Sequence, residues 1–153
     1  MTYRINGLEP APFAPLFSLD DDALAEQSIV RMAVTGSPGF PCRISLVDAE
    51  PGRSVLLLNH VSLNDGPYAA SHAIFVCEGA EQAVYPDEVA PALDRRVLSL
   101  RGFDPSHMMV EAVLAHPGEA DSAIRRLFDD PAVAYIHAHN AVRGCFAARV
   151  ERA

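Results

Sequence analysis

The sequence predicts a single α+β domain, built mainly from an antiparallel β-sheet with two or three short helices. Segments in which apolar and polar residues alternate outnumber the segments with helical periodicity. The connections between the alternating segments are short, which favours antiparallel over parallel pairing. At 153 residues the chain is long enough to bury a hydrophobic core without disulfides or metals. We therefore expect one domain over residues 1–153.

The N-terminal part of the chain should hold one strand and two short helices. Residues 3–6 alternate as a strand, and residues 12–17 carry apolar side chains at helical spacing for one turn. Ser18 and Asp21 have the spacing of a capping box, which predicts a helix that ends near Gln27. The acidic run after Ser18 then falls in the first helical turn, where the helix dipole favours carboxylates.

Four strands are expected in the middle of the chain. They cover residues 28–34, 42–47, 54–60 and 73–77. A turn at residues 50–52 should join the second and third strands into a hairpin. The intervening segment 61–71 is flanked by His60 and His72, and we expect it to be a loop long enough to act as a lid or rim.

The last third of the chain predicts two hairpins around one helix. Residues 95–101 and 108–115 should pair across a short turn. Residues 120–128 have the strongest helical periodicity in the chain, with apolar side chains on one face. Residues 133–139 and 145–151 should form the terminal hairpin.

The charge composition excludes several classes of function. All 12 basic residues are arginines and the net charge is −8, with no basic block, so nucleic acid is not an expected partner. The absence of lysine also excludes Schiff-base chemistry and a P-loop lysine. No apolar segment is long enough to span a membrane or to resemble a signal peptide, so we expect no membrane partner and a cytoplasmic location.

The terminal hairpin is the region richest in chemically active side chains. Alternation places its odd-numbered residues on one face, and a five-residue loop at 140–144 sets the expected register. In that register His139 lies opposite Cys145, and Tyr135 lies opposite Arg149. His137 shares their face, while Phe146 should lie on the other face. Titratable clusters of this kind are typical of functional sites.

Three interpretations of this face remain open. His137 and His139 are candidate ligands of a divalent metal, zinc or iron, because two imidazoles at i and i+2 on a strand converge on one side. Alternatively, a histidine activates a thiol, with Cys145 or Cys42 as the nucleophile. In the third interpretation the face is a hydrogen-bonded structural layer or an interface with another subunit.

A second candidate site is the rigid loop that contains Gly39-Phe-Pro-Cys42-Arg43. A thiol beside a guanidinium is suited to capturing an anion. We therefore predict that Arg43 and Arg149, with Tyr135, bind a small anionic substrate. The three cysteines lie far apart, without a CxxC pair, so no disulfide framework is expected.

Several motifs resemble those of a bacterial family of unknown function, DUF1203. They are Gly39-Phe-Pro-Cys42-Arg43, Ser71-His-Ala-Ile-Phe-Val76, and the string His137-Ala-His139-Asn140-Ala141 with Gly144-Cys145 and Arg149. The resemblance runs from Tyr3 almost to the last residue. It implies a single-domain cytoplasmic protein of about this size and supplies no activity.

Two classes of function follow from the residues. The first is an enzyme that acts on a small molecule through a His/Cys site, either metal- or thiol-dependent, on the terminal hairpin. The alternative is a non-catalytic module that binds a ligand or another protein, and a homodimer would be one such arrangement.

Overall fold

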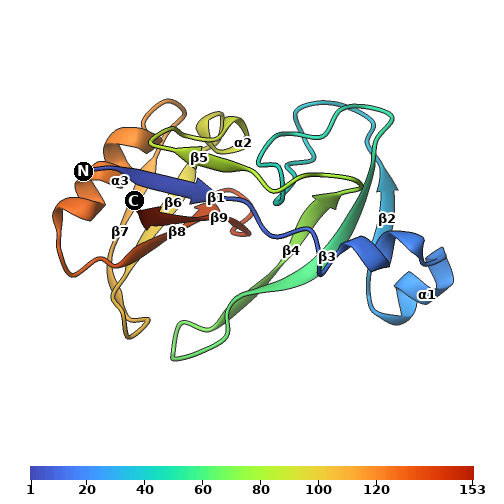
Figure 1. Cartoon of the computed structure of the whole chain (residues 1–153), viewed down its shortest axis with the longest axis horizontal. Coiled ribbons are helices and arrows are strands. Elements are labelled where there is room, and N and C mark those ends of the chain that lie inside the picture. Colours follow the sequence, from blue (N-terminus) through green and yellow to red (C-terminus); the bar gives the residue numbers. More distant parts are fainter.

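Two antiparallel β-sheets form the framework of the computed structural model, which describes residues 1–153 (Figure 1). The larger sheet has six strands, and they follow the spatial order β5 (Val84–Pro86), β1 (Tyr3–Asn6), β9 (Phe146–Arg152), β8 (Tyr135–Asn140), β6 (Leu98–Phe103) and β7 (Met109–Ala115). The smaller sheet has the order β2 (Val30–Ala33), β3 (Ser54–Leu63) and β4 (Ala70–Cys77). The α+β fold class predicted from the sequence is confirmed.

The helical elements are short. They are a 3-10 helix, η1 (Ala14–Ser18), and three α-helices, α1 (Asp21–Glu26), α2 (Pro91–Asp94) and α3 (Ala120–Asp129). None of these helices is long and apolar enough to cross a membrane. The helix α3 lies against β6 and β7, on one face of the larger sheet (Figure 1).

Each sheet has its own apolar core. The larger cluster of 19 buried residues joins α2 and α3 to one face of the six-stranded sheet, and it includes Leu98, Ile124 and Ile136. A second cluster of 13 residues surrounds the smaller sheet. Because the large sheet buries only one face against helices, its other face is available to contact the β3–β4 hairpin.

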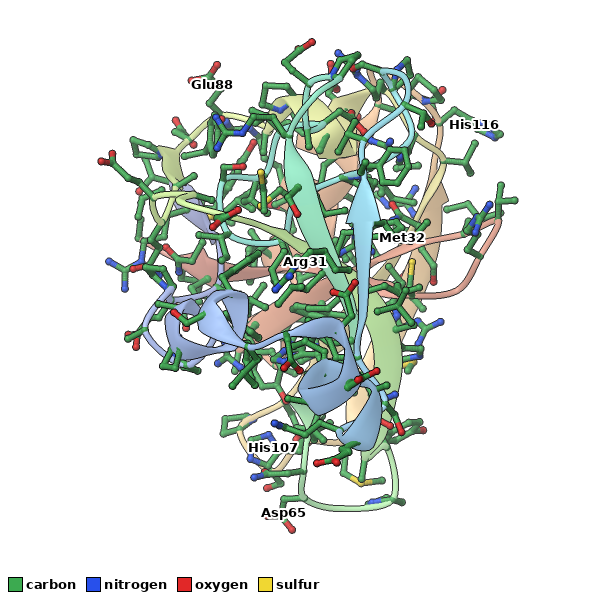
Figure 2. All side chains as sticks on the ribbon, turned by 90° about the vertical axis from the view of Figure 1, so that its right-hand side faces the viewer. Arg31, Met32, Asp65, Glu88, His107 and His116 are labelled. Atoms are coloured by element: carbon green, nitrogen blue, oxygen red, sulfur yellow. The ribbon has the colours of Figure 1, made fainter.

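The β3–β4 hairpin contacts that second face along its length. Leu63 packs with Phe103 and Tyr135 of the larger sheet, and Tyr68 lies edge-on to Phe103. The tips of the β3–β4 and β6–β7 hairpins therefore lie at the same end of the molecule, where Figure 2 places Asp65 and His107. On β2, Arg31 donates to the carbonyl oxygens of Phe17 and Leu19, which ties the smaller sheet to the first helical segment.

Two predictions about the smaller sheet are wrong. Residues 42–47 are not a strand but a tight turn, with Leu46 in the left-handed region at φ 57°. An isolated bridge from Pro41 to Asp48 closes the turn, and another joins Cys42 to Phe75 of β4. The segment 61–71 is not a lid, because β3 continues to Leu63 and β4 begins at Ala70. The strands therefore take up residues 61–63 and 70–71 of this segment and leave only residues 64–69 as a turn.

The predicted N-terminal cap of the first α-helix is also wrong. The helix begins at Asp21, and the side chain of Asp20, rather than Ser18, accepts a hydrogen bond from the backbone N–H of Ala23 at 2.8 Å. Ser18 ends the preceding 3-10 helix instead. The short elements β5 and α2 were not predicted, because three- and four-residue elements leave no periodicity to detect.

Gly7 allows the chain after β1 to pass directly over the turn that carries Arg43. Its N–H donates to Ala83, and the next residue, Leu8, donates to the carbonyl oxygen of Arg43 at 2.8 Å. A Cβ atom at Gly7 would collide with the backbone carbonyl of Ile44. Glycine is therefore required here by the close approach of two backbones.

We expect Gly7→Ala to lower the free energy of unfolding by about 2 kcal/mol, because the collision is with backbone rather than with a movable side chain. Chemical denaturation measures the effect. Gly36→Ala is the matched control, since a Cβ atom there meets nothing within 4 Å. Equal stability of the two variants would contradict the close approach.

Candidate functional site

The terminal hairpin forms as predicted, but its register differs. His137 pairs with Arg149, Tyr135 pairs with Glu151, and His139 pairs with Phe146. The predicted pairs of His139 with Cys145 and of Tyr135 with Arg149 are therefore wrong. Two features cause the difference. Asn140 belongs to β8 and donates to Cys145, so the turn is one residue shorter than expected, and one extra residue, Ala147, is inserted between the residues that face Ala138 and His139.

The bulge changes which side chains face the histidines. Phe146, expected on the opposite face, contacts His137 and His139 edge-on, with ring centroids 5.1 and 5.9 Å apart. Cys145 lies across from Asn140, whose backbone N–H donates to the Cys145 carbonyl and whose Nδ2 lies 3.5 Å from its Sγ. Since adjacent residues alternate between faces, Cys145 lies on the Asn140 side and not on the His139 side. The predicted shared face of Cys145 and the two histidines is therefore wrong.

Four histidines form a layer between the two sheets, which we call the histidine layer: His60, His72, His137 and His139. His60 and His72 lie directly opposite each other on β3 and β4. The His72 ring meets His139 edge-on at 5.0 Å, and the His60 ring lies 5.7 Å from that of Phe146. Aromatic packing of this kind joins the smaller sheet to the larger one.

The two histidines of β8 are uncharged at neutral pH. Each is only 2% exposed, and burial lowers the pKa of His137 to about 3 and that of His139 to about 4. The His139 Nδ1–H donates to the carbonyl oxygen of Gly144 at 3.0 Å, which leaves the lone pair on Nε2. His137 makes no side-chain hydrogen bond and packs between Phe103, Tyr135 and Phe146.

The residues do not fit the zinc or iron centre predicted for His137 and His139. No group of three or more His, Cys, Asp or Glu side chains is arranged to hold a metal ion. Protein zinc sites use at least three such ligands. Cys145 faces away from the pair, and the neighbours of His137 are aromatic rings.

A pocket of about 780 Å³ opens beside the histidine layer, between the two sheets. We call it the arginine pocket. It is lined by Gly39, Pro41, Arg43, Leu57, His72, Ala73, Phe75, Arg96, Val97, Asn140, Val142, Arg143 and Cys145. Every charged residue in this lining is an arginine, although the chain as a whole carries a net charge of −8.

Arg43 is the most deeply buried of these arginines, with 3% of its surface exposed. Its Nε donates to the Phe146 carbonyl at 2.7 Å, its Nη1 donates to the Pro41 carbonyl at 2.6 Å, and its Nη2 lies 3.1 Å from the Sγ of Cys145. No carboxylate pairs with it, and burial lowers the pKa of this guanidinium. An arginine nevertheless remains protonated in proteins, so a positive charge is held here without an acidic partner.

The other two arginines of the pocket differ in how they are held. Arg96 makes a two-pronged ion pair with the buried carboxylate of Asp48, which Arg95 also contacts. These arginines hold the pKa of Asp48 below its usual range, against the effect of burial. Arg143 is exposed at the β8–β9 turn and makes no side-chain hydrogen bond or ion pair.

The remaining predicted site residues lie elsewhere. Tyr135 donates or accepts a hydrogen bond with His107 at 2.7 Å, and the guanidinium of Arg149 stacks on its ring at 4.0 Å. Arg149 also pairs with Glu151, so it belongs to a separate cluster and not to the arginine pocket. Cys42 is 1% exposed and accepts a hydrogen bond from the backbone N–H of Cys77, which does not support a nucleophilic role.

Comparison with known protein families identifies the chain's relationship. Residues 39–152 of the 153 match a family described as a protein of unknown function, DUF1203. The chain belongs to the DUF1203 family. The matched segment contains every residue that lines the arginine pocket. Searches of curated proteins and of solved structures found no match.

Sequence reasoning thus missed several lining residues of this DUF1203 protein. Asn140 and Arg143 lie in the segment 140–144 that was predicted as the hairpin loop. Their closeness to Cys145 in the sequence could have indicated that they belong to the same site. Arg96 had no local signal, because only the folded chain brings it to the loop that begins at Gly39. The pocket therefore places arginine side chains beside a thiol, and its lining comes from five segments of the chain, one of which is Leu57 alone.

The buried histidines predict a loss of stability in mild acid. In the unfolded chain a histidine has a pKa near 6.5, above the folded values of about 3 and about 4. The unfolded state therefore binds more protons below pH 6.5, and stability falls as the pH is lowered through that range. Lowering the pH from 7 to 5 should therefore reduce the free energy of unfolding by roughly 2 kcal/mol for each of His137 and His139.

Urea unfolding of wild type and of His137→Phe at both pH values measures this effect. The variant should lose about 2 kcal/mol less than wild type on acidification. His116→Gln, at an exposed histidine, should behave as wild type. An identical loss in wild type and His137→Phe would show that His137 is not held neutral.

Proposed function

We propose that this DUF1203 protein binds a small organic anion in the arginine pocket and acts on it through the thiol of Cys145. The observation that carries the proposal is Arg43, a buried guanidinium whose partners are two carbonyl oxygens and the Cys145 sulfur. A buried charge without a counter-charge is costly, by several kcal/mol. A thiolate at Cys145, together with a bound anion, would supply the missing negative charge.

The rest of the lining supports an anion as the ligand. Arg43, Arg96 and Arg143 line the pocket, and no carboxylate lines it with them. Asp48 outside the lining pairs with Arg96, so the positive charge without an acidic partner is that of Arg43 and Arg143. Arg143 has no partner in the protein and is available to a ligand. Guanidinium groups bind carboxylates and phosphates with paired hydrogen bonds, which lysine cannot do.

The apolar part of the lining supports an organic ligand rather than an inorganic ion. Leu57, Phe75, Val97 and Val142 provide apolar surface beside the arginines. The volume of about 780 Å³ lies in the range of pockets that hold small organic molecules. An anion with an aliphatic or aromatic body fits both features.

Cys145 is the thiol of this proposal because it is partly exposed and lines the pocket. The N–H groups of Arg43 and Asn140 approach its sulfur at 3.1 and 3.5 Å. The sulfur can accept hydrogen bonds from both donors. Arg43 is the charged group in contact with it, and neither His137 nor His139 hydrogen-bonds to it.

One observation favours the alternative, a module that binds the anion without turnover. No imidazole or carboxylate lies within hydrogen-bond distance of Cys145, so no proton acceptor is in place in the absence of a ligand. Binding and reaction can be separated experimentally, because a binding module would retain its ligand and its anion preference when Cys145 is replaced.

The proposal predicts that Cys145 prefers anionic electrophiles. With iodoacetate or iodoacetamide the sulfur forms a bond to the CH₂ carbon and iodide leaves with the electron pair of the C–I bond. We expect the ratio of the iodoacetate rate to the iodoacetamide rate to be about tenfold higher for Cys145 than for a free thiol peptide. Added salt should reduce the ratio, because it screens the arginines.

Mass spectrometry of the native protein locates and times the modification. Arg143→Gln should lower the rate ratio, Cys145→Ser should abolish the fast modification, and Cys42→Ser should leave it unchanged. A rate ratio equal to that of the free peptide, at low salt, would overturn the anion-binding proposal.

A further inference from the structure

We infer that His72 supplies the arginine pocket with an uncharged N–H donor that binds the oxyanion of the ligand, a carboxylate or a phosphate. The inference rests on the proposed anion site and adds a specificity-determining residue to it. It depends on the place of His72 in the pocket, on its hydrogen-bonding state and on the charges around it.

His72 is the only imidazole that lines the arginine pocket. It lies on β4, directly opposite His60, and its ring packs edge-on against His139 at 5.0 Å. The edge-on contact with His139 restricts the orientation of the His72 ring at the pocket wall.

The hydrogen bonds of His72 indicate where its proton lies. Its Nδ1 is buried and has no hydrogen-bond partner. A buried N–H without a partner is rarer and costlier than a bare lone pair, so the favoured tautomer leaves Nδ1 unprotonated. The proton is then on Nε2, and the proposed donor is this Nε2–H of a residue that lines the pocket. His139 has the opposite tautomer, since its Nδ1–H donates to Gly144.

The charges that face His72 come from several elements. Arg101 on β6 and burial both lower its pKa, and His60 and His139 contribute no negative charge. Arg43, Arg96, Arg143 and the thiol of Cys145 face it across the pocket. Because burial lowers its pKa and no carboxylate lines the pocket, His72 is neutral at neutral pH before a ligand binds.

A neutral donor has a distinct consequence for binding. The arginines attract any anion, whereas the Nε2–H of His72 adds one directional hydrogen bond to an oxygen atom. This bond does not require the imidazole to gain a proton, so it persists above the usual pKa of histidine. A histidine cation, by contrast, would lose its contribution as the pH rises through 6.5.

The test measures the protection of Cys145 from iodoacetamide by two aryl anions, benzoate and phenyl phosphate. The quantity compared is the anion concentration that halves the alkylation rate. We expect His72→Phe to raise this half-protecting anion concentration about tenfold, because the variant loses one hydrogen bond to a charged group. His72→Gln should stay within about threefold of wild type, because its amide N–H can occupy the place of Nε2–H. His72→Asn, whose amide matches Nδ1 instead, should behave like His72→Phe.

The same measurement at pH 6.5 and pH 8 tests the charge of His72. Wild type should require the same anion concentration at both values. Protection that weakens at pH 8 would overturn the neutral donor, and equal protection in wild type, His72→Phe and His72→Asn would overturn any role for His72 in binding. Circular dichroism checks that each variant folds. If His72→Phe does not fold, the comparison of His72→Gln with His72→Asn tests the same prediction.

Failure of the two proposals can be told apart. If neither anion protects wild-type Cys145, the anion site itself is wrong. If protection depends on Arg143, as judged with Arg143→Gln, but not on His72, only the present inference is wrong. Benzoate and phenyl phosphate also differ in charge, so the stronger protector shows which kind of oxyanion the pocket prefers.

Discussion

The buried guanidinium of Arg43 connects the parts of this fold that are furthest apart in the sequence. Its Nε–H binds the Phe146 carbonyl, 103 residues away, and its Nη1–H binds the Pro41 carbonyl in its own turn. A bridge between Cys42 and Phe75 of β4 fixes the position of this turn. One side chain therefore links the loop, the smaller sheet and β9. Carbonyl oxygens offset only part of the cost of desolvating its charge. A negatively charged group placed beside Arg43 would therefore be stabilised.

The β-bulge at Ala147 determines what surrounds that charge. In a regular ladder Phe146 would face the helices, and the histidine face would hold Cys145. The extra residue turns Phe146 into the histidine layer and Cys145 toward Arg43 and Asn140. The same local irregularity thus separates an uncharged aromatic layer from a charged pocket. Bulges commonly re-aim side chains in this way beside functional sites.

Local patterns were sufficient to predict α3 and all the strands except β5, because alternation and helical periodicity need only nearby residues. They were insufficient for residues 42–47, where apolar alternation is satisfied by a turn that packs under Gly7 and β4 rather than by a strand. The hairpin register could not be predicted, since a one-residue bulge leaves no mark in the alternation of the sequence. The motif around Cys42 singled out Arg43 as a candidate anion-binding residue, and membership of the DUF1203 family was predicted correctly. The pocket as a whole was not predictable, because its lining comes from segments around residues 40, 72, 96 and 143.

The exclusive use of arginine has a physical consequence in such a pocket. A buried lysine readily loses its proton, and the site would then lose its charge, whereas a guanidinium keeps its charge when it is desolvated. The histidines respond in the opposite way, since burial holds the pKa values of His137 and His139 far below neutrality. Charge beside the pocket therefore comes from the arginines and from Asp48, which pairs with Arg95 and Arg96, while the histidine layer packs as neutral rings. The positive charge of Arg43 and Arg143 changes little over the physiological pH range, and the pocket wall also contains the neutral polar side chains of Asn140 and His72.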